Sequence, residues 1–260
     1  MLPTKILCIA LILLAGMVLV LAAGLPFGIS PGREGARLMA APVPKTPVED
    51  RFRFLAYEGF DGKLRLNWKP VRSDPTHVSL TKHRGKLTIT TQRGTIHGDE
   101  KAANEPSAKN LFLIDNPLSK DANFVMTTCI TDFTPAAAYQ QAGLLVYDDD
   151  DNYAKFSYEF NWAKGEGQRF ILVLETEAKP QHFPTEEVSD LKRVWLRLTK
   201  HGKSYEYATS TDGESFTVHG TQEWGDGAPK KLGLVAKNGG PDGVPEIEAN
   251  FDFFELRSTE

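Results

Sequence analysis

The sequence has few cysteines and no pair that could form a disulfide within the folded domain. Cys8 lies in an N-terminal apolar run, which leaves Cys129 as the only cysteine after residue 50. Cys129 sits in the alternating run Phe124 to Phe133, so we interpret it as a buried strand thiol. About 210 residues follow the leader and linker, enough for one large sandwich that needs no disulfide to stay folded.

The common catalytic motifs are also absent. Six histidines are scattered singly, without the i, i+4 spacing or carboxylate neighbour of a zinc hydrolase. There is no Gly-x-Ser-x-Gly elbow, phosphate-binding glycine loop or dinucleotide fingerprint. The sequence therefore does not support a zinc enzyme, serine hydrolase, kinase or Rossmann dehydrogenase.

An excess of positive charge is missing as well. Residues 51–260 hold 26 Lys and Arg against 31 Asp and Glu, a net charge of −5. Such a mildly acidic domain is a poor partner for nucleic acid or for an anionic lipid surface. We expect no nucleic-acid partner, and membrane contact only through the N-terminal segment if that segment is retained.

The N-terminal sequence predicts an export segment followed by a linker. Lys5 precedes the apolar run Ile6 to Leu25, which predicts a signal peptide or an uncleaved membrane anchor within residues 1–29. The run is long enough to span a bilayer, whereas the small residues late in it favour cleavage. Residues 30–50 are rich in Pro, Gly and Ala and predict a linker. We expect the domain, residues 51–260, to be secreted, periplasmic or membrane-anchored, outside the cytoplasm.

A period of two dominates after residue 51, with turn signals between short runs. This predicts an all-β fold, a two-sheet antiparallel jelly-roll sandwich of about a dozen strands. The best helix candidate, Thr185 to Leu191, is short. The predicted core positions are Leu64, Leu66, Trp68, Leu87, Ile89, Val194, Leu196, Leu198, Ile247, Ala249, Phe251 and Phe253.

Two clusters of acidic residues partly resemble known functional sites, but neither has the full set of residues that such a site needs. Asp148 to Asn152 fits part of an EF-hand template, but the glycine position is Tyr153 and a strand follows, so a polar turn is favoured. Glu246, Glu248 and Asn250 form a row like that of jelly-roll glycosidases, but Asn250 cannot act as a general acid. We interpret that row as an exposed polar face.

Several segments resemble a known family. They are Phe60-Asp61-Gly62 with Leu66 and Trp68, Gln141 to Asp148 with Asn152 to Lys155, Val194 to Leu198, Ser210 to Gly213 with Phe216, and Phe251 to Phe254. Their order and spacing resemble the concanavalin A-like domain at the C-terminus of family 43 β-xylosidases and related bacterial proteins of unknown function, over about residues 52–257. The resemblance implies a lectin/glucanase-type sandwich and a place in carbohydrate metabolism. It carries over no catalysis, because the reactive carboxylates of those enzymes lie in a separate propeller.

The resemblance and the residues suggest structural roles for some of these positions. Ala142 and Gly143 allow close approach of the opposing sheet, and Asp212-Gly213 suits a tight hairpin. Related sandwiches hold a structural calcium ion on an acidic residue of a terminal strand, so Asp252 is our candidate metal ligand. No cofactor is required.

A glycan site needs aromatic and polar side chains on one sheet face. By alternation, we predict that Tyr153, Lys155, Glu159 and Asn161 share a concave face with Trp195 and Arg197. Trp195 points away from the core, where it is either open or covered by a loop such as 176–190. The other tryptophans, Trp68, Trp162 and Trp224, read as core or edge packing.

These observations favour an exported, non-catalytic carbohydrate-binding module whose partner is a polysaccharide or a glycan-bearing surface. A protein-interaction or cell-envelope structural module is the alternative. A small glycoside hydrolase is disfavoured, because no complete carboxylate pair is present.

Overall fold

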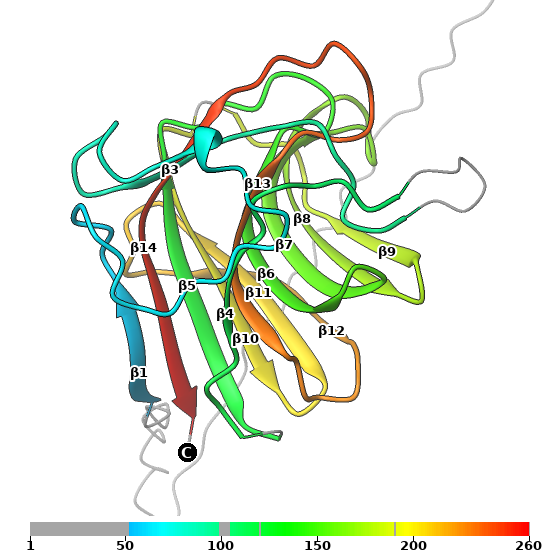
Figure 1. The fold of residues 1–260 in the computed structure, drawn as a ribbon. Helices are drawn as coiled ribbons and strands as arrows, with labels where there is room; N and C mark the ends of the chain where they lie inside the picture. Colours follow the sequence, from blue (N-terminus) through cyan, green and yellow to red (C-terminus); the bar gives the residue numbers. More distant parts are fainter. Residues whose placement is uncertain (1–51, 99–104, 120, 190, 260) are drawn as a thin grey trace, which may run out of the picture. The chain divides into compact units, whose positions relative to one another are not determined.

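The structure, a computed structural model, describes residues 52–98, 105–119, 121–189 and 191–259. The predicted leader and linker lie outside these residues, so both stay predictions. Within the described residues, no helix is long and apolar enough to cross a membrane. The described residues form strands and one 3₁₀ turn, η1 (Pro75–His77) (Figure 1).

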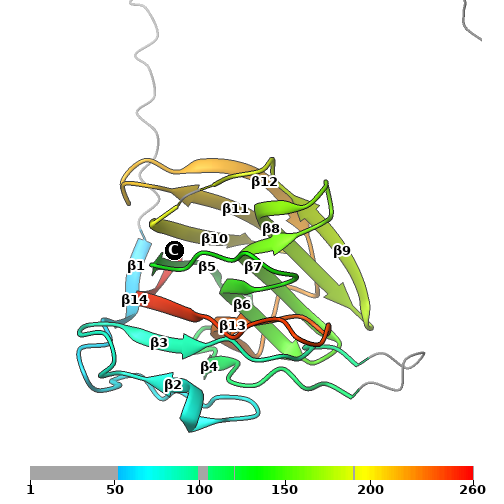
Figure 2. The ribbon, with the colours of Figure 1, turned by 90° about the horizontal axis from the view of Figure 1, so that it is seen from above.

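The larger of two antiparallel sheets has eight strands. Its order is β12 (Thr217–Glu223), β11 (Ser204–Ser210), β10 (Arg193–His201), β5 (Asn123–Thr131), β14 (Glu248–Thr259), β3 (Leu87–Thr90) and β2 (Val78–Ser79), and β1 (Phe52–Glu58) also pairs with β14. The long β14 pairs with β3 through its first residues and with β1 through its last ones. Figure 2 shows these strands following one another along one side of the molecule.

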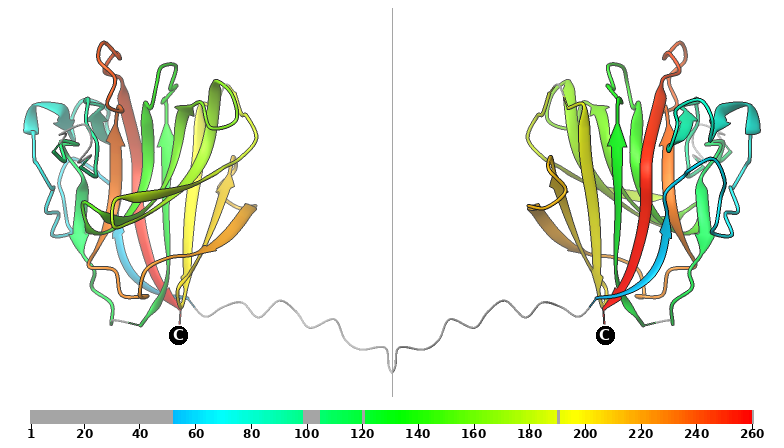
Figure 3. Two further views of the ribbon diagram at one scale, coloured as in Figure 1. Left: turned by 90° about the vertical axis from the view of Figure 1, so that its right-hand side faces the viewer. Right: turned by 90° about the vertical axis from the view of Figure 1, so that its left-hand side faces the viewer.

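The smaller sheet has six strands. Its order is β4 (Phe112–Asp115), β13 (Lys231–Lys237), β6 (Gln141–Asp149), β7 (Asn152–Asn161), β8 (Gly167–Thr176) and β9 (Lys179–Pro184). Side views show the strands of both layers rising together from the end of the molecule that holds the C-terminus (Figure 3). The predicted all-β, two-sheet antiparallel sandwich is confirmed.

One apolar core fills the space between the sheets. Its members include Ala154, Phe156 and Tyr158 from β7 and Val194, Leu196 and Leu198 from β10. Most predicted core positions are confirmed: Leu87, Ile89, Val194, Leu196, Leu198, Ala249 and Phe251 are buried. Cys129 is buried and free, as predicted.

Phe253 is a predicted core residue that the structure places elsewhere. The pairing of β14 with β5 shifts between Phe251 and Phe254, which is a β-bulge. The extra residue reverses the alternation, so Phe254 is buried in the core. Phe253 instead stacks on the exposed ring of Tyr57, with 5.8 Å between ring centroids.

The structure also differs from the prediction at Leu64 and at the helix expected over Thr185 to Leu191. Residues 59–74 form no strand, because buried Glu58 accepts hydrogen bonds from the backbone N–H groups of Arg65 and Leu66. Leu64 is consequently 39% exposed. None of the described residues of 185–191 is helical, and Val188 pairs with Gln168 as an isolated bridge.

Gly143 permits a close approach, but not the one predicted. A Cβ atom at Gly143 would lie 2.1 Å from the carbonyl oxygen of Phe156 and 2.6 Å from the Cα of Ser157. Both atoms belong to β7, the neighbouring strand of the same sheet, and not to the opposing sheet. The glycine therefore matters for pairing within the six-stranded sheet.

Candidate functional site

The structure separates the predicted site residues into two groups. Tyr153, Lys155, Glu159 and Asn161 lie on β7, whereas Trp195 and Arg197 lie on β10 in the other sheet. Both groups point away from the shared core, so they occupy opposite outer faces of the sandwich. The prediction of one common face is therefore wrong, because alternation tells which residues leave the core but not which sheet a strand joins.

The β7 group lines a pocket of about 230 Å³ on the outer face of the six-stranded sheet. We call it the β7 pocket. Its lining comes from strands β6, β7, β8, β9 and β13 and from three loops: Thr95, Ile96, His97, Tyr139, Gln141, Tyr153, Lys155, Glu159, Asn161, Val173, Glu175, Pro180, His182, Lys237, Gly239 and Gly240. The sequence-predicted residues of β7 are thus brought together.

A buried polar network surrounds the carboxylate of Glu159. Its Oε1 accepts a hydrogen bond from Asn161 Nδ2 at 2.6 Å, and its Oε2 accepts one from Ser157 Oγ at 2.8 Å. Lys155 Nζ lies 3.4 Å from the same Oε2 and also donates to Gln141 Oε1. All five side chains are buried. Charge-assisted bonds of this kind offset the cost of taking Lys155 and Glu159 out of water.

Glu175 provides a second buried carboxyl group, toward the other end of β7. The Tyr153 hydroxyl donates to Glu175 Oε2 at 3.1 Å across the β7–β8 pair. Burial raises the pKa of Glu175. Its Oε1 atom is buried and has no hydrogen-bond partner among the described residues. An unsatisfied buried acceptor of this kind is costly in the unliganded protein.

Lys237 at the end of β13 is a further buried ionisable group of the pocket. Its Nζ donates to the backbone carbonyls of Gly94 at 3.1 Å and Asn238 at 3.0 Å. Burial lowers its pKa to about 7.

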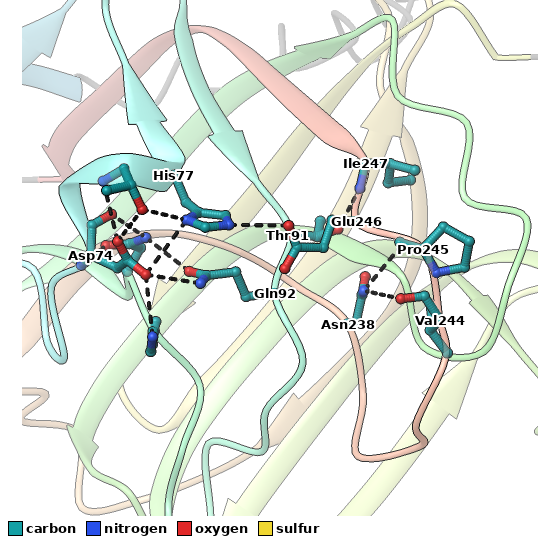
Figure 4. Close-up of polar contacts among 12 residues, drawn as sticks. Asp74, His77, Thr91, Gln92, Asn238, Val244, Pro245, Glu246 and Ile247 are labelled. Carbon is teal, nitrogen blue, oxygen red and sulfur yellow. Dashed lines mark hydrogen bonds and ion pairs between the residues drawn. The ribbon is translucent and has the colours of Figure 1, made fainter.

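Loop contacts hold the wall of the pocket beside Gly239 and Gly240. Asn238 Nδ2 donates to the carbonyl of Pro245 at 3.1 Å (Figure 4). The backbone N–H of Asn238 donates to the carbonyl of Gln92. Gln92 Nε2 in turn donates to the Asp74 carboxylate at 2.9 Å. Hydrogen bonds from Thr76 and Gln92 hold the pKa of Asp74 well below its usual range. The wall is therefore anchored to η1.

The rim carries aromatic and imidazole side chains. Trp162, which follows β7, is 46% exposed and meets Tyr139 edge to face at 5.5 Å. It is the most exposed of the four tryptophans and is not a core residue, although its ring also packs edge to face on Phe160. Trp68 packs on Phe112 and Trp224 is buried, as predicted.

Several pocket residues were absent from the sequence-based site. Glu175 and Lys237 each end an apolar strand run, and a lone charge at that position is the signal that could have marked them. Gln141 and His182 gave no comparable signal, because only strand pairing brings them to β7.

Trp195 is half-buried on the opposite face. The turn at Gly213 lies on its ring, since a Cβ atom there would be 2.9 Å from Trp195 Cε2. The cover is therefore the predicted Asp212-Gly213 hairpin rather than loop 176–190. Arg197 stacks on Phe216, with its guanidinium carbon 3.4 Å from the ring centroid. Arg197 also lines a separate polar hollow of about 420 Å³.

The remaining acidic candidates have local partners. Asp252 lies 3.8 Å from Lys86 Nζ and 3.7 Å from Arg193 Nη2, so two cations already balance it. Among the described residues, no three His, Cys, Asp or Glu side chains gather as a metal site. The calcium ligand role of Asp252 stays a prediction.

The acidic turn at Asp148 to Asn152 and the row Glu246, Glu248 and Asn250 mainly make local polar contacts. In the β6–β7 turn, Asp149 Oδ1 accepts from the Asp151 N–H and from Asn152 Nδ2, which confirms the polar turn. Glu248 is half-buried beside His83. Asn250, predicted to be exposed, is buried and accepts a hydrogen bond from Thr88.

Two antiparallel sheets packed around one apolar core have the architecture of a concanavalin A-like jelly-roll domain. A family model described as the beta xylosidase C-terminal concanavalin A-like domain matches residues 58–257. The chain belongs to this family. No match is found among curated proteins.

Solved structures share this fold at low sequence identity. The GH43 protein BlXynB from Bacillus licheniformis is 21% identical with a TM-score of 0.64, covering 78% of this chain and 39% of that one. Xylan beta-1,4-xylosidase from Bacillus halodurans is 17% identical with a TM-score of 0.60, covering 84% and 41%. The CBM2 module of the evolved Dit of Lactobacillus casei BL23 phage J-1 is 11% identical with a TM-score of 0.52, covering 80% and 97%. The matched part of this chain thus spans about two-fifths of the length of BlXynB and of the xylan beta-1,4-xylosidase.

Proposed function

We propose that this protein is a non-catalytic carbohydrate-binding module and that its glycan binds in the β7 pocket. The observation that supports this most is the buried polar set on the pocket floor, in which Glu175 Oε1 has no partner among the described residues. Sugars present hydroxyl groups that satisfy such acceptors. The apolar side chains of Ile96, Val173 and Pro180 complete the lining and suit the C–H faces of a sugar ring.

The polar contacts of Glu159 support a non-catalytic role. A glycosidase needs two carboxyl groups that are free to act as acid, base or nucleophile. Glu159 is instead fully engaged with Lys155, Ser157 and Asn161.

Direct binding measurements with the full chain test the proposal. Xylo-oligosaccharides are the first ligands, since two proteins of similar structure are a GH43 protein and a xylan beta-1,4-xylosidase. We expect saturable binding by calorimetry, and about tenfold weaker binding in His182→Ala, which removes an exposed side chain from the pocket lining.

His201→Ala is the matched control, because His201 is exposed on the opposite sheet. Trp195→Ala tests the other face in the same assay. Equal loss in His182→Ala and His201→Ala, or loss in Trp195→Ala alone, would contradict the assignment of the β7 pocket. Failure to bind any polysaccharide on a broad glycan array would contradict the function itself.

We further propose that the domain acts outside the cytoplasm, on the strength of the apolar run Ile6 to Leu25. N-terminal sequencing of the mature protein tests this. A start between Ala23 and Pro42 means release, and an intact Met1 in the membrane fraction means an anchor. An intact protein in the cytosol would refute export.

A further inference from the structure

The hydrogen bonds of Lys237 fit an unprotonated amine. Its Nζ has two acceptors, the carbonyl oxygens of Gly94 and Asn238. A neutral amine has two N–H bonds to donate, whereas an ammonium group has three. Among the described residues, no carboxylate lies within ion-pair distance of Lys237. Two carbonyl acceptors thus leave the nitrogen lone pair of the neutral form unused.

Lys155 shows the contrasting arrangement in the same pocket. Its Nζ lies 3.4 Å from the carboxylate oxygen Oε2 of Glu159, and this opposite charge favours the ammonium form. Both lysines line the β7 pocket and both are buried, so they differ mainly in their partners. Burial, followed by the positive charge of Lys155, lowers the pKa of Lys237 to about 7, and the charge of Glu159 only partly opposes this shift.

We propose that Lys237 is a nucleophilic amine that forms an imine with an aldehyde entering the β7 pocket. The Nζ lone pair attacks the aldehyde carbon, the C–N bond forms and the carbonyl oxygen takes up a proton. Loss of this oxygen as water then leaves the C=N bond, so one amine and one aldehyde give one imine and one water. The ligand class is a small aldehyde, including the open-chain form of a reducing sugar. This activity does not depend on the proposed glycan binding.

Reductive trapping of the full-length protein tests the inference. The protein is incubated at pH 7 with glycolaldehyde, or in a second arm with xylose, and with sodium cyanoborohydride as the hydride donor. Trapping converts the imine into a secondary amine and adds the mass of the aldehyde less one oxygen atom. Peptide mapping by mass spectrometry then locates the modified lysine.

We expect Lys237 to be modified at least about tenfold faster than exposed Lys63, since about half of its amine is unprotonated at pH 7 against far below 1% for an ordinary lysine. Its rate should rise through pH 7 and level off, whereas the rate at Lys63 should still rise above pH 9. Buried Lys155 should stay unmodified, and Lys237→Met should remove the fast site. If only glycolaldehyde modifies Lys237, the ligand class is limited to small aldehydes. If xylose modifies it too, the ligand class also includes reducing sugars.

The inference would be overturned if Lys237 were modified no faster than Lys63, or only after unfolding in urea. Equal labelling of Lys155 and Lys237 would also overturn the inference. The two buried lysines would then react alike, and their different partners would have no effect on reactivity. Glycan binding measured separately on the same preparation keeps the two proposals distinguishable.

Discussion

Breaking the Lys155–Glu159 pair should destabilise the fold strongly. Lys155→Met leaves the Glu159 carboxylate buried with Ser157 and Asn161 as its remaining donors. Removing one partner of a buried ion pair costs about 3 to 5 kcal/mol. We expect the low end, about 3 kcal/mol, because two hydrogen bonds to Glu159 survive.

The double variant Lys155→Met/Glu159→Gln separates pairing from packing. It keeps both side-chain volumes and removes both charges, so it should cost about 1 kcal/mol, less than Lys155→Met alone. The expected coupling energy between the two sites is about 2 kcal/mol or more.

Urea unfolding at pH 7, followed by circular dichroism, measures the stability of all four proteins of this cycle. They are the unchanged protein, the single variants Lys155→Met and Glu159→Gln, and the double variant. Unchanged slopes with shifted midpoints would show that only stability changed. The reasoning would be refuted if the stability losses of the two single variants added up to that of the double variant, which means a coupling energy near zero. A loss below about 1 kcal/mol for Lys155→Met would refute it as well. The exposed pair Lys164–Glu186, at 2.7 Å, is the control and should couple by less than about 1 kcal/mol.

The remaining predictions concern single sites. Gly143→Ala should cost more than about 3 kcal/mol in thermal or urea unfolding, because its Cβ would lie 2.1 Å from a backbone oxygen, whereas Gly240→Ala, with nothing nearer than 3.8 Å, should be near neutral. Burial raises the pKa of the Cys129 thiol to about 12, so a thiol reagent should label it only after unfolding; rapid labelling of the native protein would contradict its burial. Because the folded pKa of Lys237 is lowered to about 7 from 10.5, the unfolded chain binds more protons between these values and the free energy of unfolding should rise over that pH range. Lys237→Met should flatten this rise, and an unchanged pH slope in the variant would contradict the lowered pKa.

The fold was predictable because most strands carry their burial pattern in local alternation. Val194, Leu196 and Leu198 on β10 and Leu87 and Ile89 on β3 could be assigned to the core from spacing alone. Phe253 could not, because a bulge in β14 depends on pairing with β5 and leaves no local sequence signal. Leu64 failed for a similar reason, since the hydrogen bonds to Glu58 form only in the folded chain.

The site was predictable only within one strand. Tyr153, Lys155, Glu159 and Asn161 share a face by period two, and the structure keeps them in one pocket. Assigning Trp195 and Arg197 to the same face required knowing that β10 joins the same sheet as β7, which it does not. Glu175, Lys237 and the Gly239-Gly240 wall reach the pocket through strand pairing and loop contacts, which are non-local.

The distribution of buried charge favours the β7 pocket as the functional part of this domain. A sandwich that only had to fold would bury apolar side chains and leave the outer strand faces to solvent. Here Lys155, Glu159, Glu175 and Lys237 are buried on one outer face, and each must be compensated by specific partners. Departures of this kind from the simplest folding pattern are expected at functional sites. The exposed acidic turn at Asp149 and the covered ring of Trp195 show no comparable cost, so the pocket is where binding experiments should begin.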